Sequence, residues 1–409
     1  MYIYKVGVVG AGTMGAQIAE VVSYAGLPVM LADRDEPLAR RGVESVRAIY
    51  QARVDKGKMT PEQLEEKMLL VTASQTFDGL KDVDLVIEAV SEDLALKLQI
   101  LQKLDQVCTK GAILTSNTSA LSISALGAAT KRPGKVVGLH FFNPAYVMPL
   151  VEVIPGLATD QQTVDDVVGF AESLRKSPVV VKECAGFLVN RLLSPYLNEA
   201  VWCLQDDAVS IKDIDQDLVS FGMPVGPFAL LDAVGLDIAF EVARILHRSY
   251  GPRMAPAPLL EALVKSGRWG IKTGHGFYDY VSDEAGGRDQ SLEHLMQQAR
   301  LHSGQQTTRM GWTRSRPLLA MVNEAVIALQ EGVASARDID FAMVAGTGFP
   351  NEKGGPLHFA DQLGIDRVLQ ELEEFRTSLG DRFWPAPMLR RMVDAGLTGQ
   401  IAGRGFFTY

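Results

Sequence analysis

Residues 3–33 read IYKVGVVGAGTMGAQIAEVVSYAGLPVMLAD. Residues 3–9 alternate in the manner of a buried strand, and the glycine-rich segment 10–15, GAGTMG, follows directly. Residues 16–25 have the apolar spacing of an amphipathic helix, and a second short apolar stretch then ends on an aspartate. This order of strand, Gly-x-Gly-x-x-Gly, helix, strand and acid predicts the first βαβ unit of a doubly wound, Rossmann-type α/β domain.

The three glycines and the acid each have a physical task. Gly10 permits a tight turn, Gly12 lets the backbone approach a pyrophosphate, and Gly15 lets helix and strand pack closely. The helix N-terminus offers N–H groups and a positive dipole end to phosphates. Asp33, 18 residues after Gly15, can accept hydrogen bonds from ribose hydroxyls and would repel a 2′-phosphate. The motif predicts an NAD site, although Arg34 beside Asp33 leaves NADP open.

Composition narrows the class of protein. A chain of 409 residues with 47% hydrophobic residues is long enough for two or three domains with sizeable cores. No apolar run approaches the ~20 residues that a membrane span needs. The net charge of −9 argues against general nucleic-acid binding but not against an anionic small molecule.

Histidines and cysteines give no sign of a metal or disulfide framework. The six histidines form no HxxxH or HxH pattern, so we expect no metal site. The three cysteines are widely spaced, which favours a reducing, cytoplasmic compartment. Met1 stands two residues before the first strand, so we expect no signal or transit peptide.

Polar residues follow two further predicted strands. Glu92 and Lys97 come after the buried run 85–89, and loops after parallel strands face the ligand crevice, so both are candidate cofactor contacts. Glu92 could equally serve the dipole of the following helix. The next strand ends in residues 116–119, Ser-Asn-Thr-Ser, which could cradle a substrate or cap a helix over residues 121–128.

Residues 138–153, GLHFFNPAYVMPLVEV, predict a strand, a loop and a returning strand. If the loop is centred on Tyr146, His140 lies six residues before the centre and Glu152 six after, so the two side chains oppose each other on one face. A carboxylate beside an imidazole makes a general acid/base pair. The alternative is a structural hydrogen bond at a sheet edge. Asn143 opens the loop.

A basic helix is expected over residues 37–54. Its arginines could be solvated, or some could meet the anionic tail of a substrate; they are Arg40, Arg41, Arg47 and Arg53.

The second half of the chain contains an internal repeat. Residues 198–201, NEAV, recur as 323–326 at an offset of 125, and Gly276-Phe277 recurs as Gly405-Phe406 at an offset of 129. The change of offset marks a four-residue insertion near residues 351–354. The apolar spacing in both copies is helical.

The predicted organisation is therefore an α/β domain followed by two tandem all-α domains made by duplication. The expected limits are 1–184 for the NAD-binding domain, 185–281 for the first helical copy, 282–309 for a linker and 310–409 for the second copy. A short helix is possible in the linker at 292–299. The first copy opens with Asn190 where the second has Ser315, which mildly favours a chemical role for Asn190 over a helix cap.

Several stretches together resemble a known family, the 3-hydroxyacyl-CoA dehydrogenases of fatty-acid β-oxidation. They are GAGTMG, SNTSA, GLHFFNPAYVMPLVEV, AGFLVNRLL and MPVGPFALLD, and the resemblance covers essentially the whole chain. The doubled C-terminal part resembles the dehydrogenase half of the fused multifunctional β-oxidation enzymes. The resemblance implies a stand-alone dehydrogenase that converts (S)-3-hydroxyacyl-CoA and NAD to 3-ketoacyl-CoA and NADH, reversibly.

The resemblance also implies roles for individual residues. His140 is the acid/base, Glu152 its partner, and Ser119 and Asn190 hold the reacting oxygen of the substrate. Implied cofactor contacts are Gly10, Gly12, Gly15, Asp33, Glu92, Lys97 and Asn143. Ser45 and Arg53 fall near the family's CoA-contacting helix, where the match is loose.

Three alternatives stand beside this interpretation. One is a dehydrogenase of a free β-hydroxy acid, which would more usually rely on a lysine base. Another is a 3-hydroxybutyryl-CoA dehydrogenase that works reductively, and the third is a non-catalytic NAD-binding protein. Single-copy relatives commonly dimerise through the helical domain, so the duplication favours a monomeric pseudo-dimer or a weaker homo-oligomer. A separate hydratase or thiolase is a possible partner.

Overall fold

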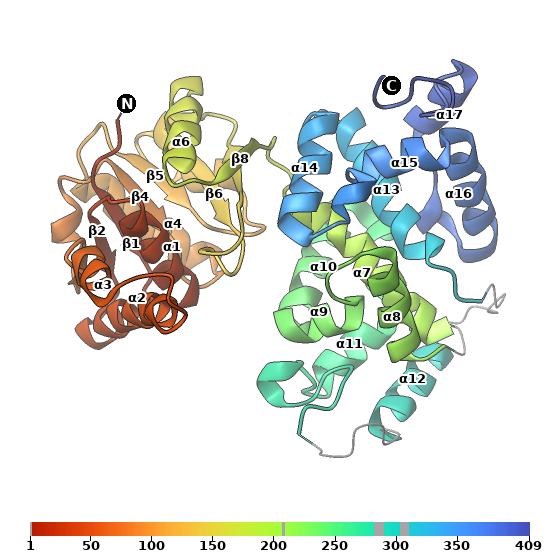
Figure 1. The fold of residues 1–409 in the computed structure, drawn as a ribbon, viewed down its shortest axis with the longest axis horizontal. Helices are drawn as coiled ribbons and strands as arrows, with labels where there is room; N and C mark the ends of the chain where they lie inside the picture. Colours follow the sequence, from red (N-terminus) through yellow and green to blue (C-terminus); the bar gives the residue numbers. More distant parts are fainter. Residues whose placement is uncertain (1, 207–208, 282–289, 303–310) are drawn as a thin grey trace. The chain divides into compact units, whose positions relative to one another are not determined.

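The computed structural model describes residues 2–206, 209–281, 290–302 and 311–409. The chain divides into two compact units, with the boundary between Phe187 and Leu188 (Figure 1). Each unit has its own core, and each is described here by itself.

Unit 1 is built on one twisted sheet whose strand order is β3-β2-β1-β4-β5-β6-β7-β8. Neighbouring strands are parallel except for the antiparallel pair β6–β7. The strands are β1 (Val6–Val9), β2 (Val29–Ala32), β3 (Val71–Ser74), β4 (Leu85–Glu88), β5 (Ile113–Ser116), β6 (Val136–Phe141), β7 (Leu150–Pro155) and β8 (Ser177–Val180). The predicted doubly wound α/β fold is confirmed.

Helices connect the strands and bury both faces of the sheet. They are α1 (Thr13–Tyr24), α2 (Glu36–Asp55), α3 (Pro61–Met68), α4 (Leu94–Val107), α5 (Ile123–Ala128) and α6 (Gln161–Ser173), with short 3-10 turns η1 (Phe77–Leu80) and η2 (Pro133–Lys135). In β4, Leu85 and Ile87 join the core that includes α1 and α6, whereas Val86 is buried on the opposite face. Strands buried on both faces read as continuous apolar runs, as the sequence of β4 does.

Unit 2 consists of two helical copies. The first has α7 (Val189–Asp206), α8 (Ile211–Phe221), α9 (Pro227–Val234), α10 (Leu236–Tyr250), η3 (Gly251–Met254), α11 (Pro258–Lys265), η4 (Ile271–Thr273) and α12 (Gln290–His302). The second has α13 (Ser315–Gln330), α14 (Ala336–Thr347), η5 (Asn351–Lys353), α15 (Pro356–Leu363), α16 (Ile365–Leu379), η6 (Asp381–Phe383) and α17 (Pro387–Asp394). The central helices α7 and α13 pack against each other (Figure 1).

The duplication extends to individual hydrogen bonds. Asp232 accepts from the amides of Phe277 and Tyr278, each at 2.9 Å, and from the Tyr280 hydroxyl at 3.1 Å. The equivalent Asp361 accepts from two amides at 2.9 and 3.0 Å and from a tyrosine hydroxyl at 3.1 Å. Each copy also ends in small β-bridges, so the domains are not purely helical.

The segment between the copies contains more structure than expected. The helix expected at 292–299 is α12, which runs from Gln290 to His302 and packs on α11 and α7. The remainder of the expected linker, 282–289 and 303–309, lies outside the described residues. Across the described part of the chain, no helix combines the length and the apolar character that crossing a membrane requires.

Candidate active site

The glycine loop between β1 and α1 has the shape that the motif predicts. Gly10 has φ of +102°, and a Cβ there would lie 2.7 Å from the carbonyl oxygen of Ala89. A Cβ on Gly15 would lie 1.7 Å from the Gly10 carbonyl oxygen, so helix and strand touch at this point. A Cβ on Gly12 would meet no described atom within 4 Å. The backbone is therefore packed too closely at Gly10 and Gly15 to admit a side chain, whereas Gly12 borders open space.

The start of α1 and the end of β2 suit a dinucleotide. Among the described residues, no side chain hydrogen-bonds the first amides of α1, which leaves them for phosphate oxygens. Asp33 Oδ2 accepts from Ala11 N at 2.7 Å, and its Oδ1 accepts from Arg34 N at 2.7 Å. The carboxylate thus fixes the glycine loop and stands at the carboxyl end of the parallel strands, where such ligands bind. These residues fit NAD.

His140 and Glu152 lie directly opposite each other on β6 and β7, so the predicted register is confirmed. His140 Nδ1 and Glu152 Oε2 are 2.7 Å apart. Glu152 is fully buried, and His140 is 5% exposed. A carboxylate only accepts, so it holds the proton of the neutral imidazole on Nδ1 and leaves Nε2 as the acceptor.

Ser119 lies on the other side of the imidazole. Its Oγ is 3.2 Å from His140 Nε2, so the hydroxyl donates to that nitrogen. The rings of Phe142 and Phe187 flank the imidazole, with centroids 4.6 and 6.0 Å away. Hydroxyl, imidazole and carboxylate therefore form one line, in which Nε2 faces the half-buried Ser119.

The loop that carries Ser119 is pinned to β6 by its neighbour Asn117. Asn117 Oδ1 accepts from the amide of Phe141 at 2.8 Å. The alternative in which this polar run caps the next helix is wrong, because α5 begins at Ile123 and Ser122 caps it through Ala125 N. The side chains of Ser116 and Asn117 instead join the carboxyl end of β5 to those of β4 and β6.

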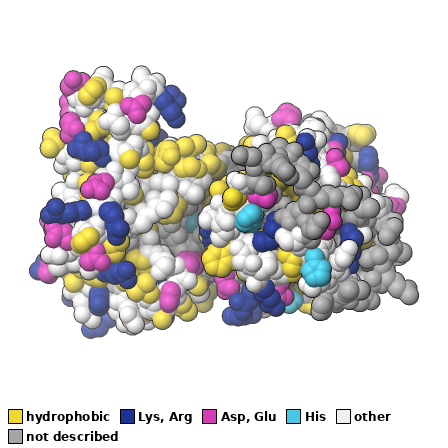
Figure 2. All heavy atoms as spheres, turned by 90° about the horizontal axis from the view of Figure 1, so that it is seen from below, with side chains coloured by type: hydrophobic (Ala, Val, Ile, Leu, Met, Phe, Trp, Pro, Cys, Tyr) yellow, Lys and Arg dark blue, Asp and Glu magenta, His cyan; other side chains and the backbone are white. Residues whose placement is uncertain are grey.

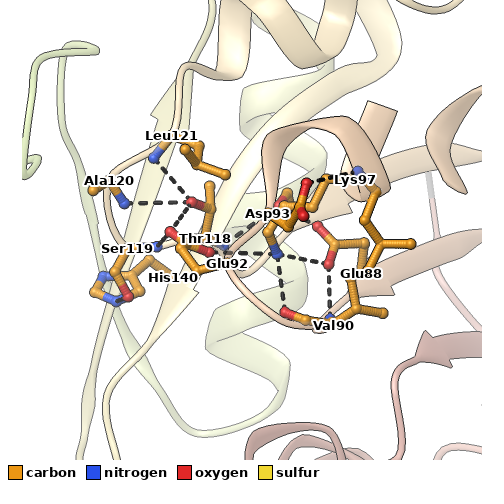
Figure 3. A network of polar contacts seen from close by, with 12 residues as sticks. Glu88, Val90, Glu92, Asp93, Lys97, Thr118, Ser119, Ala120, Leu121 and His140 are labelled. Atoms are coloured by element: carbon orange, nitrogen blue, oxygen red, sulfur yellow. Dashed lines mark hydrogen bonds and ion pairs between the residues drawn. The ribbon is translucent and has the colours of Figure 1, made fainter. Parts of the chain in front are cut away.

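Glu92 also holds this loop (Figure 3). Its Oε1 accepts from the Thr118 hydroxyl at 2.5 Å and from Ser119 N at 3.0 Å. Asp93, not Glu92, caps α4 through Leu96 N. Lys97 is 1% exposed, and its Nζ lies 3.5 Å from Glu92 Oε2. The sequence predicts Thr118 only as one member of the run 116–119, and its contact with Glu92, 26 residues away, appears only in the structure.

Asn143 lies in the loop between β6 and β7, and Gln17 on α1 holds that loop. Gln17 Nε2 donates to Asn143 Oδ1 at 3.1 Å, and Gln17 Oε1 accepts from Ala145 N at 2.7 Å. This bridge brings Asn143 beside the helix that follows the glycine loop. Gln17 was missed from the sequence because a glutamine on an amphipathic helix carries no distinguishing pattern.

Two predicted substrate residues, Ser45 and Arg53, lie on α2, which contributes no residue to the line of Ser119, His140 and Glu152. Ser45 is exposed on α2. Arg53 pairs with the buried Glu20 at 2.7 Å and lies 4.3 Å from the Tyr24 ring centroid. Asn190 is the second residue of α7 and belongs to unit 2. On the face shown in Figure 2, Lys and Arg side chains lie among Asp and Glu side chains.

Within the described ranges, no group of three or more His, Cys, Asp or Glu side chains could hold a metal ion. The site is thus a buried acid/base line next to a dinucleotide-binding loop. That combination defines a class, the dinucleotide-dependent oxidoreductases of the Rossmann type.

Comparison with known proteins identifies the family within this class. The family model for the NAD-binding domain of 3-hydroxyacyl-CoA dehydrogenase matches residues 5–184. The model for the C-terminal domain of the same family matches residues 186–280 and again 311–409. The chain belongs to the 3-hydroxyacyl-CoA dehydrogenase family.

Individual relatives agree with this assignment. The chain is 38% identical over 398 residues to the fatty acid oxidation complex subunit alpha of Shewanella sp. (strain MR-4), covering 96% of this chain and 55% of the relative. It spans about half the length of the curated relatives it matches.

Solved structures with the same fold include two 3-hydroxybutyryl-CoA dehydrogenases. The enzyme from Escherichia coli K12 has a TM-score of 0.86 at 32% identity and covers 97% of this chain and 99% of its own. The enzyme PaaH1 from Ralstonia eutropha has a TM-score of 0.67 at 38% identity and covers 68% of this chain and 100% of its own.

Proposed function

We propose that this protein catalyses the reversible, NAD-dependent oxidation of (S)-3-hydroxyacyl-CoA to 3-ketoacyl-CoA in fatty-acid oxidation. The observation that supports this most directly is the line Ser119–His140–Glu152, with contacts of 3.2 and 2.7 Å, in the same unit as the glycine loop. Family membership over nearly the whole chain supports the substrate class.

In the proposed mechanism, His140 Nε2 removes the proton of the substrate's 3-hydroxyl group. Bound NAD supplies a hydride acceptor for C3. Glu152 stabilises the imidazolium that forms, because its buried carboxylate lies 2.7 Å from Nδ1. Ser119 orients the reacting oxygen, and Asn190 is proposed to do so from unit 2. In the reverse direction His140 returns the proton.

The remaining roles follow the same proposal. Asp33 accepts from the adenosine ribose, and the free amides at the start of α1 hold the pyrophosphate. The full set of proposed cofactor contacts is Gly10, Gly12, Gly15, Asp33, Glu92, Lys97 and Asn143. Ser45 and Arg53 remain predicted contacts for the CoA tail, although Arg53 would have to leave Glu20 to make one.

The test is the oxidation of NADH, followed by absorbance, with acetoacetyl-CoA and with acetoacetate. Turnover with the thioester alone is the expected result. Turnover with the free acid alone would favour a dehydrogenase of free β-hydroxy acids. If neither compound is reduced, a non-catalytic NAD-binding role replaces the proposal.

A second candidate is a 3-hydroxybutyryl-CoA dehydrogenase that works reductively. It is favoured by the similarity to the Escherichia coli enzyme of that name, which extends over 97% of this chain. Values of kcat/KM for 3-hydroxyacyl-CoA substrates of increasing chain length separate the candidates. A maximum at four carbons supports the short-chain enzyme, and a maximum at longer chains supports a general role in oxidation.

We also propose that the protein is a monomer in which the duplication replaces a dimer. The basis is the packing of α7 on α13 within one chain. A cytoplasmic location and a separate hydratase or thiolase partner stay predictions from the sequence.

A further inference from the structure

Glu88 is the last residue of β4, and nothing in the proposed chemistry assigns it a role. It is a fully buried carboxylate that accepts three hydrogen bonds. Val90 N donates to Oε1 at 2.8 Å, Lys97 Nζ donates to the same oxygen at 2.7 Å, and the Ser116 hydroxyl donates to Oε2 at 2.5 Å. Because Glu88 pairs with Ser116 across the sheet, this carboxylate ties the ends of β4 and β5 together.

Glu88 and Lys97 also hold both backbone polar groups of Val90. The carboxylate takes its N–H, and Lys97 Nζ donates to its carbonyl oxygen at 3.2 Å. Gly10 packs directly against this segment, because a Cβ on Gly10 would lie 2.9 Å from Val90 N. The pair therefore lies immediately beneath the glycine loop.

Lys97 connects Glu88 to the reacting centre (Figure 3). Its ammonium lies 2.7 Å from Glu88 Oε1 and 3.5 Å from Glu92 Oε2. Glu92 in turn holds Ser119 through the backbone amide. Lys97 Nζ lies between the two carboxylates, and the second contact draws Glu92 inward, against the loop of Ser119.

We propose that Glu88 is a positioning residue for the reaction, acting through Lys97 and Glu92 on Ser119. A buried ion pair is weak evidence for stability on its own, because desolvation offsets the attraction. Its value here is geometric. The Ser119 loop is held by a short chain of ion pairs and hydrogen bonds that runs from Glu88 through Lys97 and Glu92. An error of about 1 Å in the position of a reacting group can lower the rate about 100-fold.

The test compares Glu88→Gln and Lys97→Met with a matched control, Asp105→Asn. Asp105 also lies in unit 1 and forms a largely buried pair with Arg132 at 2.7 Å, but it takes no part in the site. Amide hydrogen exchange of the protein without cofactor or substrate is measured first. Faster exchange at residues 117–121 is expected in the two variants and not in the control. Unchanged exchange at 117–121 in both variants would overturn the proposal.

The kinetic arm rests on the proposed function and uses acetoacetyl-CoA with NADH. Glu88→Gln and Lys97→Met are expected to lower kcat by about 10- to 100-fold, with KM for the thioester nearly unchanged. In a Ser119→Ala background Glu88→Gln should change kcat by less than about twofold, because the two substitutions remove one effect. An equal loss in both backgrounds would show that Glu88 acts independently of Ser119.

The two arms separate two failures. If the unaltered protein does not reduce acetoacetyl-CoA, the proposed function fails, while the exchange measurement still decides whether Glu88 orders the Ser119 loop. If the protein is active and the control Asp105→Asn loses as much kcat as Glu88→Gln, the effect is one of general stability and the inference is wrong.

Discussion

His140 is the side chain on which the proposed chemistry depends most. Its two ring nitrogens face Ser119 and Glu152, and neither contact involves the glycine loop. We expect His140→Gln to lower kcat by about 10²- to 10⁴-fold, because the amide cannot take a proton from the substrate. The dissociation constant of NADH, measured by fluorescence titration, should stay within about threefold of the unaltered value, because the glycine loop is untouched.

The control for this substitution is His275→Gln, on an exposed histidine of unit 2. That variant should retain its kcat. A His140→Gln protein that kept most of its turnover would show that another group acts as the base.

Asp33 is expected to decide between the two nicotinamide dinucleotides. Its carboxylate holds the glycine loop through Ala11 N, so Asp33→Ala removes both a ribose contact and a loop contact. Loss of a charged hydrogen bond costs about 1.5–3 kcal/mol, which corresponds to roughly 10- to 100-fold weaker NADH binding. Binding of NADPH should weaken less or improve, because the repulsive charge is gone. Titration of both dinucleotides checks this, and a uniform loss for both would contradict the assignment.

At the scale of single residues, the sequence predicts side-chain contacts within one hairpin better than contacts between strands that are distant in the chain. The register of His140 and Glu152 follows from the symmetry of a loop between two antiparallel strands, and it is confirmed. The sequence does mark Glu88 as unusual, because it is a charged residue within the apolar run 85–89. Its partners Lys97 and Ser116 are 9 and 28 residues away. The pairing of β4 with β5 brings Ser116 to Glu88, and the packing of α4 brings Lys97.

At the scale of elements, the two helical copies place an aspartate at the same position, Asp215 and Asp340, but surround it with different hydrogen-bond partners. Asp215 takes the first amides of α9 and the Tyr278 hydroxyl. Its counterpart Asp340 takes the first amides of α15, and His358 Nδ1 lies 3.3 Å from it. Burial raises the pKa of Asp340 to about 7, against the hydrogen bonds from two amides, and the nearby Asp361 adds to the rise.

This raised pKa predicts how the stability of unit 2 depends on pH. The unfolded chain releases the Asp340 proton near pH 3.8, and the folded protein keeps it up to about pH 7. The folded state binds more protons between these values, so the contribution of Asp340 to stability is complete below pH 3.8 and is lost as the pH rises to about 7. Asp340→Asn does not titrate. The loss of unfolding free energy that this substitution causes should therefore shrink between pH 5 and pH 8 by up to roughly 3 kcal/mol, because about two pH units of that window lie below the raised pKa.

The measurement is urea unfolding of both proteins at pH 5 and pH 8, following the transition of unit 2. Asp215→Asn is the matched variant. Burial also raises the pKa of Asp215, but the Tyr278 hydroxyl donates to this carboxylate and opposes the rise, which it does not do for Asp340. The loss of unfolding free energy caused by Asp215→Asn should change less with pH. A loss for Asp340→Asn that stayed constant from pH 5 to pH 8 would contradict the raised pKa.

The start of a helix is predictable from the sequence where a nearby residue caps it. Asp35 caps α2 through Leu38 N, and Thr60 forms a capping box with Gln63 at the start of α3. Both helices therefore begin at a residue whose own side chain satisfies the free amides of the first turn. The helix predicted from residue 121 begins instead at Ile123, because Ser122 is the residue that caps it, through Ala125 N.

At the scale of the whole molecule, unit 2 contains the arrangement expected of a twofold interface within one chain. Arg191 on α7 pairs with Glu324 on α13 at 2.7 Å, and the equivalent Arg316 pairs with Glu199 at 2.6 Å. A second arginine from each copy adds to these pairs at 3.2 and 2.8 Å; the contacts are Arg253–Glu324 and Arg382–Glu199. Reciprocal contacts of this kind are the signature of an isologous dimer.

The proposal of a monomer is supported by these pairs, because each arginine finds its carboxylate within the same chain. Light scattering should report the mass of one chain, and the melting midpoint should not change over a 100-fold range of protein concentration, as it would for a dimer. Arg191 and Glu324 are both buried, so Arg191→Met should lower the free energy of unfolding by about 3 kcal/mol without changing the mass. If that substitution instead converted a dimer into monomers, the pairs would lie between chains and the duplication would not have replaced the partner.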